Sequence, residues 1–377
     1  MSKILINCSN LHGGGSAAVA TSFISFLAKS GLSHRYSLLI SSYVYKNLQS
    51  LNIELKTFDS CMVLNVFGIW SIFKRTDLIF SNYDIVFTIF GPIYSVRVFK
   101  EKHIYGFAQP WIIYPNNLIS ISMSYFFRTI TRWKYLIQAI FFRRANLLIV
   151  ELNHVKSRLS KNLLLKKSRI EIVHSEVDEI FYTRNSWVEC YLPQQNDGYT
   201  KIGIISKNYP HKNLIILPLV REILLKKYSM LVDFYLTLSK DEWDNADPSI
   251  KESTINCGTL LLSQCPSFYE KMDGVIFPSL LECFSAVPIE AMVMQKPLFA
   301  SNLPFIRDCC GDFCEYFDPL DPQDVALSIA DYFKSIDELH KQEKITNAFN
   351  YAVGTFPRGM RGKRYIDIID AMIHSSK

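Results

Sequence analysis

The fold of this chain is decided by one stretch, Gly274-Val-Ile-Phe-Pro-Ser-Leu-Leu-Glu282-Cys-Phe-Ser-Ala-Val-Pro-Ile-Glu290-Ala-Met292. The stretch predicts a short buried strand over residues 275–277, then a loop, and then a helix that begins near Pro288. Proline fits a first helical position because an N–H group there would have no partner within the helix. The loop therefore ends in unpaired backbone N–H groups at a helix N-terminus, an arrangement that binds anions.

Two carboxylates flank this expected anion site. Glu282 lies in the loop and Glu290 in the first turn of the helix, with seven residues between them. Because a carboxylate repels a phosphate, acids beside an anion site suggest a ligand that also offers hydroxyl groups. A nucleotide sugar offers a diphosphate for the N–H groups and ribose and hexose hydroxyls for the acids. The alternative is that both glutamates are ordinary surface residues near a helix start.

The stretch resembles the Glu-x7-Glu signature of retaining GT-B glycosyltransferases of the group-1 (GT4) family, which includes bacterial O-antigen, capsule and lipopolysaccharide enzymes. Pro278-Ser279, Phe284 and Ala291-Met292 are in register with that signature, whereas Cys283 and Ser285 stand where the family usually has glycines. The resemblance implies an α/β protein of two Rossmann-like domains that face each other across a cleft. It also implies a C-terminal helix that crosses back to the first domain.

Length and composition fit two globular domains. A chain of 377 residues is too long for one ordinary core, and a hydrophobic content of 49% can supply two. By the resemblance, we expect an acceptor-side domain over residues 1–185, which the tail helix 355–377 joins. A linker over residues 186–199, rich in turn-forming residues, then leads to a nucleotide-sugar-binding domain over residues 200–354.

Charge distribution, cysteine spacing and the length of the apolar runs indicate where in the cell the protein is located. Residues 1–190 hold 22 Lys and Arg against 11 Asp and Glu, while the remainder holds 19 against 24. The nine cysteines lack metal-binding spacing, and the adjacent Cys309 and Cys310 suit neither a disulfide nor a zinc site. We expect no signal peptide, because the N-terminus leads straight into an expected strand, and no apolar run is long enough to span a bilayer. We therefore expect a cytoplasmic protein, peripheral on the inner face of the cytoplasmic membrane.

The N-terminus predicts a strand, a glycine turn and a helix, which is how a Rossmann-like domain begins. Gly13, Gly15 and Ala18 satisfy a loose dinucleotide fingerprint. A dinucleotide site also needs an acidic residue about 20 residues further on, whereas the first acidic residue of this chain is Glu54. The NAD interpretation is therefore disfavoured. The resemblance instead places Gly14 and Gly15 in the family's first loop, over the donor diphosphate and near the acceptor.

Two further segments of the N-terminal half point to the acceptor and to a membrane. Gln109-Pro110-Trp111 follows an expected strand and resembles an acceptor-side segment of bacterial O-antigen enzymes, which implies that Gln109 and Trp111 lie beside the acceptor. Residues 102–150 contain eleven aromatic residues and six Lys or Arg, but no Asp or Glu. Such a basic, aromatic, helix-capable segment suits an anionic membrane surface, a role we assign to residues 118–144. The alternatives are a core helix with a basic face and a nucleic-acid patch, which no nucleic-acid fold signature accompanies.

The C-terminal half supplies cations for a diphosphate. Lys207 and Lys212 follow an expected strand and resemble the two cations that clamp the donor diphosphate in the family, with Lys207 in the arginine position. Fixed cations stabilise the charge that gathers on a leaving diphosphate. The resemblance implies that this site works without a bound divalent ion, and the chain has no Asp-x-Asp metal motif to contradict this. We therefore expect neither a metal ion nor another cofactor. Gly258 and Leu260 resemble a strand and glycine turn that contact the nucleotide base.

Together these resemblances imply a retaining, metal-independent hexosyltransferase with a nucleotide diphosphate sugar as donor. The implied acceptor is a lipid-linked saccharide in bacterial surface polysaccharide (O-antigen) synthesis. Glu290 would hold the ribose diol, while Glu282 would hold sugar hydroxyls and steady positive charge at the anomeric carbon. The diphosphate would be bound by Lys207, Lys212 and the backbone N–H groups of Phe284, Ser285, Ala286 and Val287. A nucleotide-sugar epimerase of the same fold and a non-catalytic, membrane-attached scaffold protein are the alternatives.

Overall fold

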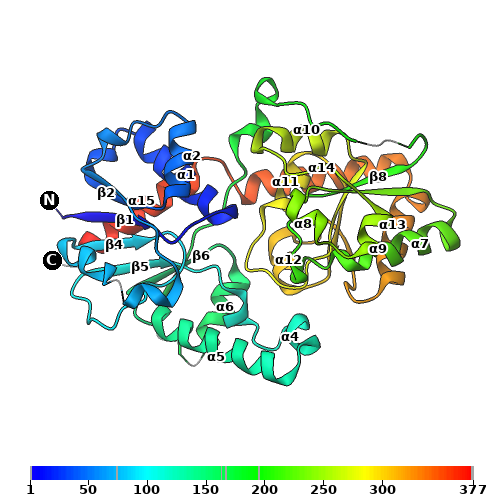
Figure 1. Cartoon of the computed structure of the whole chain (residues 1–377). Coiled ribbons are helices and arrows are strands. Elements are labelled where there is room, and N and C mark those ends of the chain that lie inside the picture. The colour runs from blue at the N-terminus through cyan, green and yellow to red at the C-terminus, as the bar shows by residue number, and fades with distance from the viewer. Residues whose placement is uncertain (1, 74, 163, 166–167, 194–195, 375–377) are drawn as a thin grey trace. The chain divides into compact units, whose positions relative to one another are not determined.

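The computed structural model describes residues 2–73, 75–162, 164–165, 168–193 and 196–374 (Figure 1). The chain divides into two compact units. The first consists of Met1–Pro115, Met123–Ser175 and Gly359–Lys377, and the second of Asn116–Ser122 and Glu176–Arg358. The expected domain boundaries at residues 185 and 355 stay predictions.

Within the described residues, the first unit contains a seven-stranded parallel sheet in the order β3-β2-β1-β4-β5-β6-β7. Its strands are β1 (Ile4–Cys8), β2 (Tyr36–Ile40), β3 (Ser60–Val63), β4 (Ile85–Thr88), β5 (Lys102–Gly106), β6 (Leu147–Val150) and β7 (Arg169–Ile172). The chain moves outward from β1 in both directions, so β1 and β4 form the switch point of the sheet. Open α/β sheets bind ligands at the carboxyl ends of the strands beside such a switch point.

Helices cover both faces of this sheet (Figure 1). One face carries α1 (Gly14–Lys29), α2 (Ser42–Ser50) and α15 (Met360–His374), and the other carries α5 (Tyr125–Phe142) and α6 (Asn153–Lys161). The short α3 (Pro110–Ile113) follows β5. Helix α1 buries an apolar face that includes Phe23, Ile24 and Leu27, because these hydrophobic residues recur at helical spacing. Helix α5 buries only Ala139 and Phe142.

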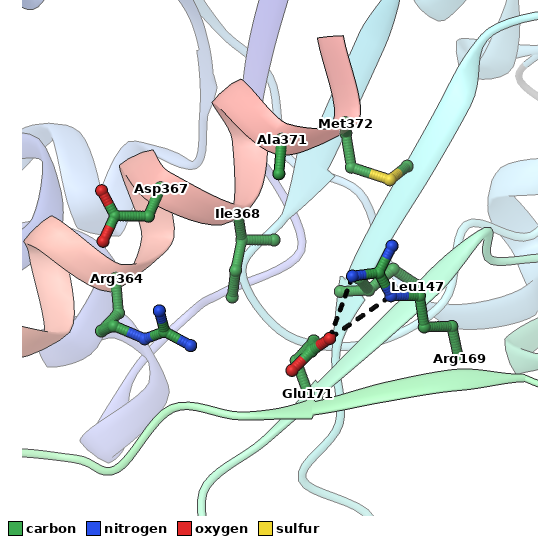
Figure 2. Close-up of a pocket in the computed structure, with 8 residues that line it drawn as sticks. All are labelled: Leu147, Arg169, Glu171, Arg364, Asp367, Ile368, Ala371 and Met372. Atoms are coloured by element: carbon green, nitrogen blue, oxygen red, sulfur yellow. Dashed lines mark hydrogen bonds and ion pairs between the residues drawn. The ribbon is translucent and has the colours of Figure 1, made fainter. Parts of the chain in front are cut away.

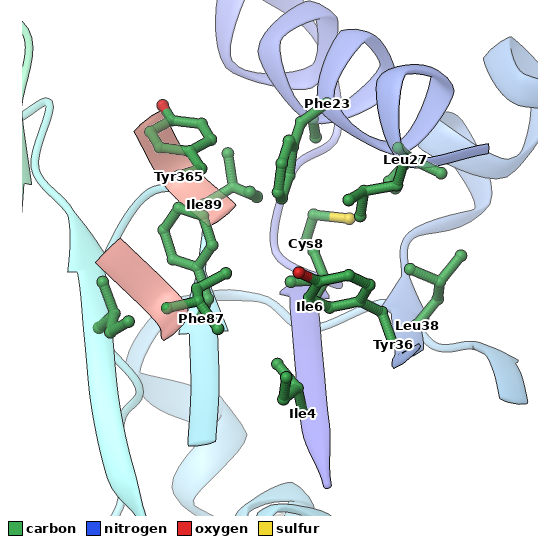
Figure 3. Close-up of a cluster of buried hydrophobic side chains, with 14 of the residues drawn as sticks. Ile4, Ile6, Cys8, Phe23, Leu27, Tyr36, Leu38, Phe87, Ile89 and Tyr365 are labelled. Carbon is green, nitrogen blue, oxygen red and sulfur yellow. The ribbon is translucent and has the colours of Figure 1, made fainter. Parts of the chain in front are cut away.

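The C-terminal helix α15 completes the core of the first unit (Figure 3). The ring of Tyr365 lies 5.1 Å from the ring of Phe23 in α1 and 5.0 Å from that of Phe87 in β4. Ile369 is fully buried in the same cluster. Helix α15 is thus packed against α1 and β4 of the first unit, as the resemblance predicts.

Within the described residues, the second unit contains a six-stranded parallel sheet in the order β10-β9-β8-β11-β12-β13, whose switch point lies between β8 and β11. Its strands are β8 (Thr200–Ile204), β9 (Val232–Leu236), β10 (Thr254–Asn256), β11 (Gly274–Phe277), β12 (Leu298–Ser301) and β13 (Glu315–Phe317). Its α-helices are α4 (Leu118–Ser122), α7 (Leu217–Tyr228), α8 (Lys240–Asp244), α9 (Pro248–Ser253), α10 (Cys265–Glu270), α11 (Ala286–Val293), α12 (Pro304–Cys310), α13 (Pro322–Ser335) and α14 (Glu338–Thr355).

The prediction of two Rossmann-like parallel-sheet domains is confirmed, and two details differ. Helix α11 begins at Ala286, not near Pro288, because proline is tolerated throughout the first turn, where N–H groups lack helical partners. Strand β3 was not expected from the sequence. Its four residues are exposed at the sheet edge, so they show no alternation of apolar and polar residues.

Candidate functional site

The loops that follow β8 and β11 meet at the switch point of the second sheet. The two strands pair in parallel through Gly274 with Ile202 and Val275 with Gly203, so their carboxyl ends lie side by side. The N–H of Leu280 donates to the carbonyl of His211 at 2.7 Å, which ties one loop to the other. Residues about 70 positions apart in sequence are thereby brought together.

A lysine and a glutamate predicted for the site form an ion pair at this junction. Lys212 Nζ lies 2.5 Å from Glu282 Oε1, and both side chains are largely buried. The hydroxyl of Ser279 donates to the same carboxylate oxygen at 3.2 Å. The Nζ group also lies 5.2 Å from the centre of the Phe277 ring. These contacts hold a cation and an acid together in the loops that follow β8 and β11.

His211 is a member of this cluster that the sequence analysis did not identify. Its Nε2 lies 4.0 Å from Glu282 Oε1. Burial lowers the pKa of His211 below its ordinary value, and nearby Lys212 lowers it further, while Glu282 opposes both. The imidazole is therefore neutral at pH 7. Its position directly before Lys212 is a sequence signal that could have found it.

Lys207 lies in the same loop as Lys212, between two fixed residues. The N–H of Ser206 donates to Thr237 Oγ1 at 3.2 Å, and the N–H of Asn208 donates to Glu242 Oε1 at 3.3 Å. The side chain of Lys207 is exposed. Lys207 is therefore exposed to solvent on a backbone that hydrogen bonds hold in place. It lies near Lys212 in sequence but takes no part in the Lys212–Glu282 ion pair.

Asn213 explains how the loop turns immediately after Lys212. Its backbone adopts the left-handed region, with φ 56° and ψ 34°, which is uncommon for residues other than glycine, asparagine and aspartate. Its side chain is buried and donates to the carbonyl of Pro319 at 2.8 Å. The asparagine therefore fixes the direction in which Lys212 leaves the backbone.

The first turn of α11 provides the expected N–H groups. The helix begins at Ala286, and Pro288 contributes no N–H, so the first-turn donors are those of Ala286 and Val287. Ser285 is extended, with φ −141°, and makes no capping side-chain bond to any described residue. Cys283 is likewise absent from the described residues with positive φ. The two positions that replace family glycines therefore need no glycine backbone conformation.

Glu290 lies in the second turn of α11, not in the first as expected, because the helix begins earlier than predicted. The Tyr269 hydroxyl, from α10, donates to Glu290 Oε2 at 2.9 Å. Burial raises the pKa of Glu290 to about 7; the Tyr269 bond opposes this, and the charge of Asp178 adds to it. Burial also holds the pKa of Tyr269 well above its usual range, so this phenol remains a donor. No sequence pattern marked Tyr269, which lies in an apolar segment.

Gly258 and Leu260 lie after β10, also at a carboxyl strand end. Gly258 has φ 77°, a conformation that favours glycine. The Asn256 side chain links this loop to the loop that follows β9. It donates to the carbonyl of Leu238 at 3.0 Å and accepts from the N–H of Gly258 at 3.3 Å. Leu260 packs partly buried against the small cluster around Cys190.

In the first unit, the glycine loop lies at the carboxyl end of β1. Gly13 caps α1, and Gly14 has φ 67°. No described heavy atom lies within 4 Å of the position that a Cβ would take on Gly14 or Gly15. The side chain of Asn10 donates to the carbonyl of Phe90 at 2.8 Å, which ties this loop to the one after β4. The loop thus presents open backbone at the switch point of the first sheet.

The two predicted acceptor-side residues follow β5. Gln109 is the N-cap of α3, and Trp111 lies within that helix. The ring of Trp111 stacks on Tyr135 of α5, with 5.6 Å between centroids and 7° between planes. Trp111 is therefore positioned by α5, while Gln109 lies at the carboxyl end of the strand.

A buried acid in the first unit was also missed. Glu151 follows β6 directly and is 8% exposed. Burial raises its pKa to about 7, although the nearby Arg361 and a bond with Ser175 oppose the rise. Arg361 donates to Ser175 Oγ at 3.0 Å and to Ser22 Oγ at 3.1 Å. The cluster links α15 to the sheet and to α1.

A small cavity of about 140 Å³ lies between α15 and the strands β6 and β7 (Figure 2). Leu147 and Arg169, the first residues of these strands, line it together with Arg364 and Asp367. It therefore lies at the amino ends of the strands, opposite the edge at which such sheets bind ligands. Among the described residues, no three His, Cys, Asp or Glu side chains form a group able to hold a metal ion.

No family model matches the chain. Over 208 residues it is 21% identical to the O-antigen chain mannosyltransferase RfbU of Salmonella typhimurium, a match that covers 54% of this chain and 56% of the relative. The matched region therefore spans about half the length of this curated relative.

Solved structures match over nearly the whole chain. A glycosyltransferase from Rickettsia africae superimposes with a TM-score of 0.70 at 14% identity, covering 99% of each chain. The Anabaena protein HepE, solved in complex with UDP-glucose, gives a TM-score of 0.69 at 14% identity, covering 98% of this chain and 100% of its own. This chain has the GT-B fold. Both comparisons lead to glycosyltransferases, as the sequence resemblance predicts.

Proposed function

We propose that this GT-B protein is a glycosyltransferase that takes a hexose from a nucleotide diphosphate sugar. One observation carries the proposal. Lys212 and Glu282 are paired at 2.5 Å at the switch point of the second sheet, and the loop that holds Glu282 leads into the first turn of α11. A cation, two N–H donors and an acid at one strand edge match the phosphates and hydroxyls of such a donor.

The proposed roles follow from these positions. Lys212 and Lys207, with the N–H groups from Phe284 to Val287, bind the diphosphate and stabilise its charge as it leaves. Glu290, held by Tyr269, accepts hydrogen bonds from the ribose diol. Glu282 accepts hydrogen bonds from sugar hydroxyls and stabilises positive charge at the anomeric carbon.

The proposed reaction is retaining and needs no metal ion. The bond from the anomeric carbon to the departing phosphate oxygen breaks, and a bond from that carbon to the acceptor oxygen forms on the same face of the sugar. The proton of the acceptor hydroxyl passes to the departing phosphate oxygen. Lysines and helix N–H groups provide the charge stabilisation that a divalent cation provides elsewhere.

The proposed acceptor is a lipid-linked saccharide at a membrane surface, by analogy with the O-antigen relative. Within the described residues, no helix is both long and apolar enough to cross a bilayer. The α5 part of the predicted range 118–144 instead exposes Phe126, Phe127 and Trp133 together with Arg132 and Lys134. We propose that this helix lies on an anionic membrane surface.

The test is thermal unfolding with UDP, GDP and dTDP, each with and without a chelator. A nucleotide at a hundred times its dissociation constant stabilises a protein by about 2.7 kcal/mol, a readily measured shift in Tm. We expect one nucleotide to raise the Tm and the chelator to leave that shift unchanged. A shift that vanishes with chelator contradicts metal independence, and three nucleotides without effect contradict the proposed site.

A product assay separates the proposal from its alternatives. Incubation with the matching nucleotide sugar and a lipid-linked saccharide should yield a glycosylated lipid together with free nucleoside diphosphate. Release of nucleotide without glycosylated acceptor supports an epimerase. If Glu282→Gln and Glu290→Gln leave cellular glycan unchanged, a non-catalytic scaffold is supported instead.

A further inference from the structure

A second exposed apolar segment lies on the first unit, outside the range 118–144. Residues 61–73 contain no charged side chain. Within this segment, Phe67, Trp70 and Phe73 are 58%, 72% and 79% exposed. Residues 67–73, here named the aromatic turn, include the 3-10 helix Gly68–Ile72. Three large exposed rings in one short turn indicate an apolar partner, because exposure to water forgoes their hydrophobic stabilisation.

The 3-10 helix that follows the aromatic turn lies over the same face of the first sheet as α5. The side chains of His103 and Tyr105 in β5 point to one face, and Tyr105 meets Phe142 of α5. Phe80, in the 3-10 helix that follows the turn, meets the ring of His103 in β5 edge-on at 6.2 Å. Phe99 lies 4.0 Å from the same imidazole, and Arg144, which follows α5, lies 4.4 Å from the centre of the Phe99 ring. These contacts connect the 3-10 helix that follows the aromatic turn to Arg144, which follows α5.

Two further apolar side chains of the first unit are strongly exposed. Val96 and Val98 are 84% and 82% exposed, in the loop that joins β4 to β5. Arg144 donates to the carbonyls of Ser95 and Arg97, which fixes this loop against the end of α5. The loop thus adds exposed apolar side chains next to the end of α5.

The charges of this face identify its partner. Residues 102–150, which include α5, hold six Lys or Arg and no Asp or Glu. Arg132 and Lys134 are exposed beside Trp133 on α5. Protein surfaces normally intersperse both signs of charge, whereas a bilayer with anionic lipids presents one sign over a wide plane. Tryptophan and phenylalanine beside cations suit the interface of such a bilayer.

We propose that the aromatic turn inserts into an anionic bilayer and acts with α5 as a second membrane-binding element. The turn is tied to the glycine loop at the start of α1. The N–H of Val66 donates to the carbonyl of Ser9 at 3.0 Å, and His12 Nε2 lies 2.9 Å from the carbonyl of Val66. The ring of Phe67 stacks on His12 at 4.2 Å. Insertion of the turn therefore holds the glycine loop close to the lipid headgroups. If the proposed function holds, a lipid-linked acceptor presents its sugar at this same level.

Vesicle flotation tests the proposal, with phosphatidylcholine vesicles prepared with and without phosphatidylglycerol. The variant carries Trp70→Ser and Phe73→Ser, both at exposed positions that leave the core intact. The matched control carries Leu225→Ser and Leu339→Ser, exposed leucines of the second unit. We expect the wild type and control to bind vesicles that contain phosphatidylglycerol, and the aromatic-turn variant to bind at least about tenfold more weakly.

Fluorescence gives an independent measurement of insertion. Brominated lipids quench tryptophans that enter the bilayer, so quenching of the wild type should fall in Trp70→Phe. Trp243→Phe, which changes a partly buried ring of the second unit, should leave the lipid-dependent quenching unchanged. Equal quenching of the wild type and Trp70→Phe overturns the proposal.

Three other outcomes also overturn it. The aromatic-turn variant could bind vesicles as tightly as the wild type, or the wild type could ignore both kinds of vesicle. Thirdly, sedimentation could show a wild-type dimer and a monomeric variant without vesicle binding, which would assign the turn to a second copy of the chain.

Nucleotide-induced stabilisation, measured without lipid, should be the same in the variant and the wild type. If nucleotides do not stabilise the wild type, that result counts against the proposed function and not against membrane insertion of the aromatic turn.

Discussion

At the residue scale, the Lys212–Glu282 pair gives the sharpest prediction, because the two partners should affect nucleotide binding in opposite ways. Lys212→Met removes the cation that faces the diphosphate, so we expect nucleoside diphosphate to bind at least about tenfold more weakly. Glu282→Gln releases Lys212 from its ion pair, so the nucleotide should bind as tightly as in the wild type or more tightly. Transfer should nevertheless fall by about 10²–10³-fold in both variants.

Calorimetric titration measures the binding, and product formation measures the transfer. Lys226→Met is the matched control, since Lys226 is an exposed lysine paired with Glu222 on α7. This control should retain both properties. Weaker nucleotide binding in Glu282→Gln would contradict the assignment of Glu282 to the sugar rather than to the diphosphate.

Glu290 and Tyr269 predict a pH dependence of donor binding. Because burial raises the pKa of Glu290 to about 7, only a minority of this carboxyl is ionised at pH 6 and most of it at pH 8. Ribose hydroxyls donate more strongly to the ionised form, so nucleotide affinity should rise from pH 6 to pH 8. Tyr269→Phe removes a bond that lowers the pKa, and should move the rise to higher pH.

Titrations at several pH values test this, with Glu290→Gln as the control that lacks the carboxyl. The nucleotide phosphates also titrate near pH 6, so the Glu290→Gln profile supplies the background. An unshifted profile in Tyr269→Phe would show that the phenol does not control Glu290.

The sequence predicted part of this site and not the rest, for a physical reason. Glu282, Glu290 and Lys212 lie in local segments in which a strand, a loop and a helix follow one another, and such segments have recognisable patterns. Tyr269 touches Glu290 through a tertiary contact between two helices, and a contact between distant segments has no local pattern. The left-handed backbone of Asn213 was likewise visible only in the structure, although its side chain type permits it.

At the scale of elements, the close approach of α1 and α15 is testable at one glycine. A Cβ on Gly362 would lie 2.5 Å from Cδ1 of Phe26 in α1, so Gly362→Ala should destabilise the protein by about 1–3 kcal/mol. Gly354, in α14, has no described heavy atom within 4 Å of its would-be Cβ. Gly354→Ala should therefore leave stability unchanged or raise it by up to about 1 kcal/mol.

Urea unfolding of the two variants measures the difference. Both substitutions make the same chemical change in a helix, so the comparison separates the contact from helix propensity. Equal effects would mean that Phe26 moves aside freely and that the two helices are not tightly packed.

Most elements could be predicted because buried parallel strands and amphipathic helices have distinct periodicities. Strand β3 could not, because an exposed edge strand lacks a buried face. The sequence predicts the start of α11 two residues too late, because Pro288 marks the first turn of the helix but not its first residue. Proline restricts its own φ but does not fix how many residues precede it in the first turn.

At the scale of the whole molecule, each unit contains an acid whose pKa is raised by burial, and this couples stability to pH. Burial raises the pKa of Glu151 in the first unit and of Glu290 in the second to about 7. In the unfolded chain both have ordinary values near 4.5. The folded state therefore holds more protons between these values, and the two acids make stability fall as the pH rises from about 4.5 to 7.

Thermal unfolding between pH 5 and pH 8 measures this slope. Glu151→Gln and Glu290→Gln should each reduce the loss of Tm with rising pH, and the double variant should reduce it further, since the two acids lie in separate units. Other titrating groups are common to all four proteins and cancel in the comparison. Slopes identical to that of the wild type would show that neither acid is protonated in the folded state.

The position of α15 in the first unit has a consequence for synthesis on the ribosome. Residues 176–358, which form most of the second unit, all leave the ribosome before α15 does. The second unit can therefore fold while the first still lacks Tyr365 and Ile369 from its core. The usual N-to-C order of co-translational folding is thus reversed, and the nascent first unit exposes an apolar face that chaperones can bind until the last helix emerges.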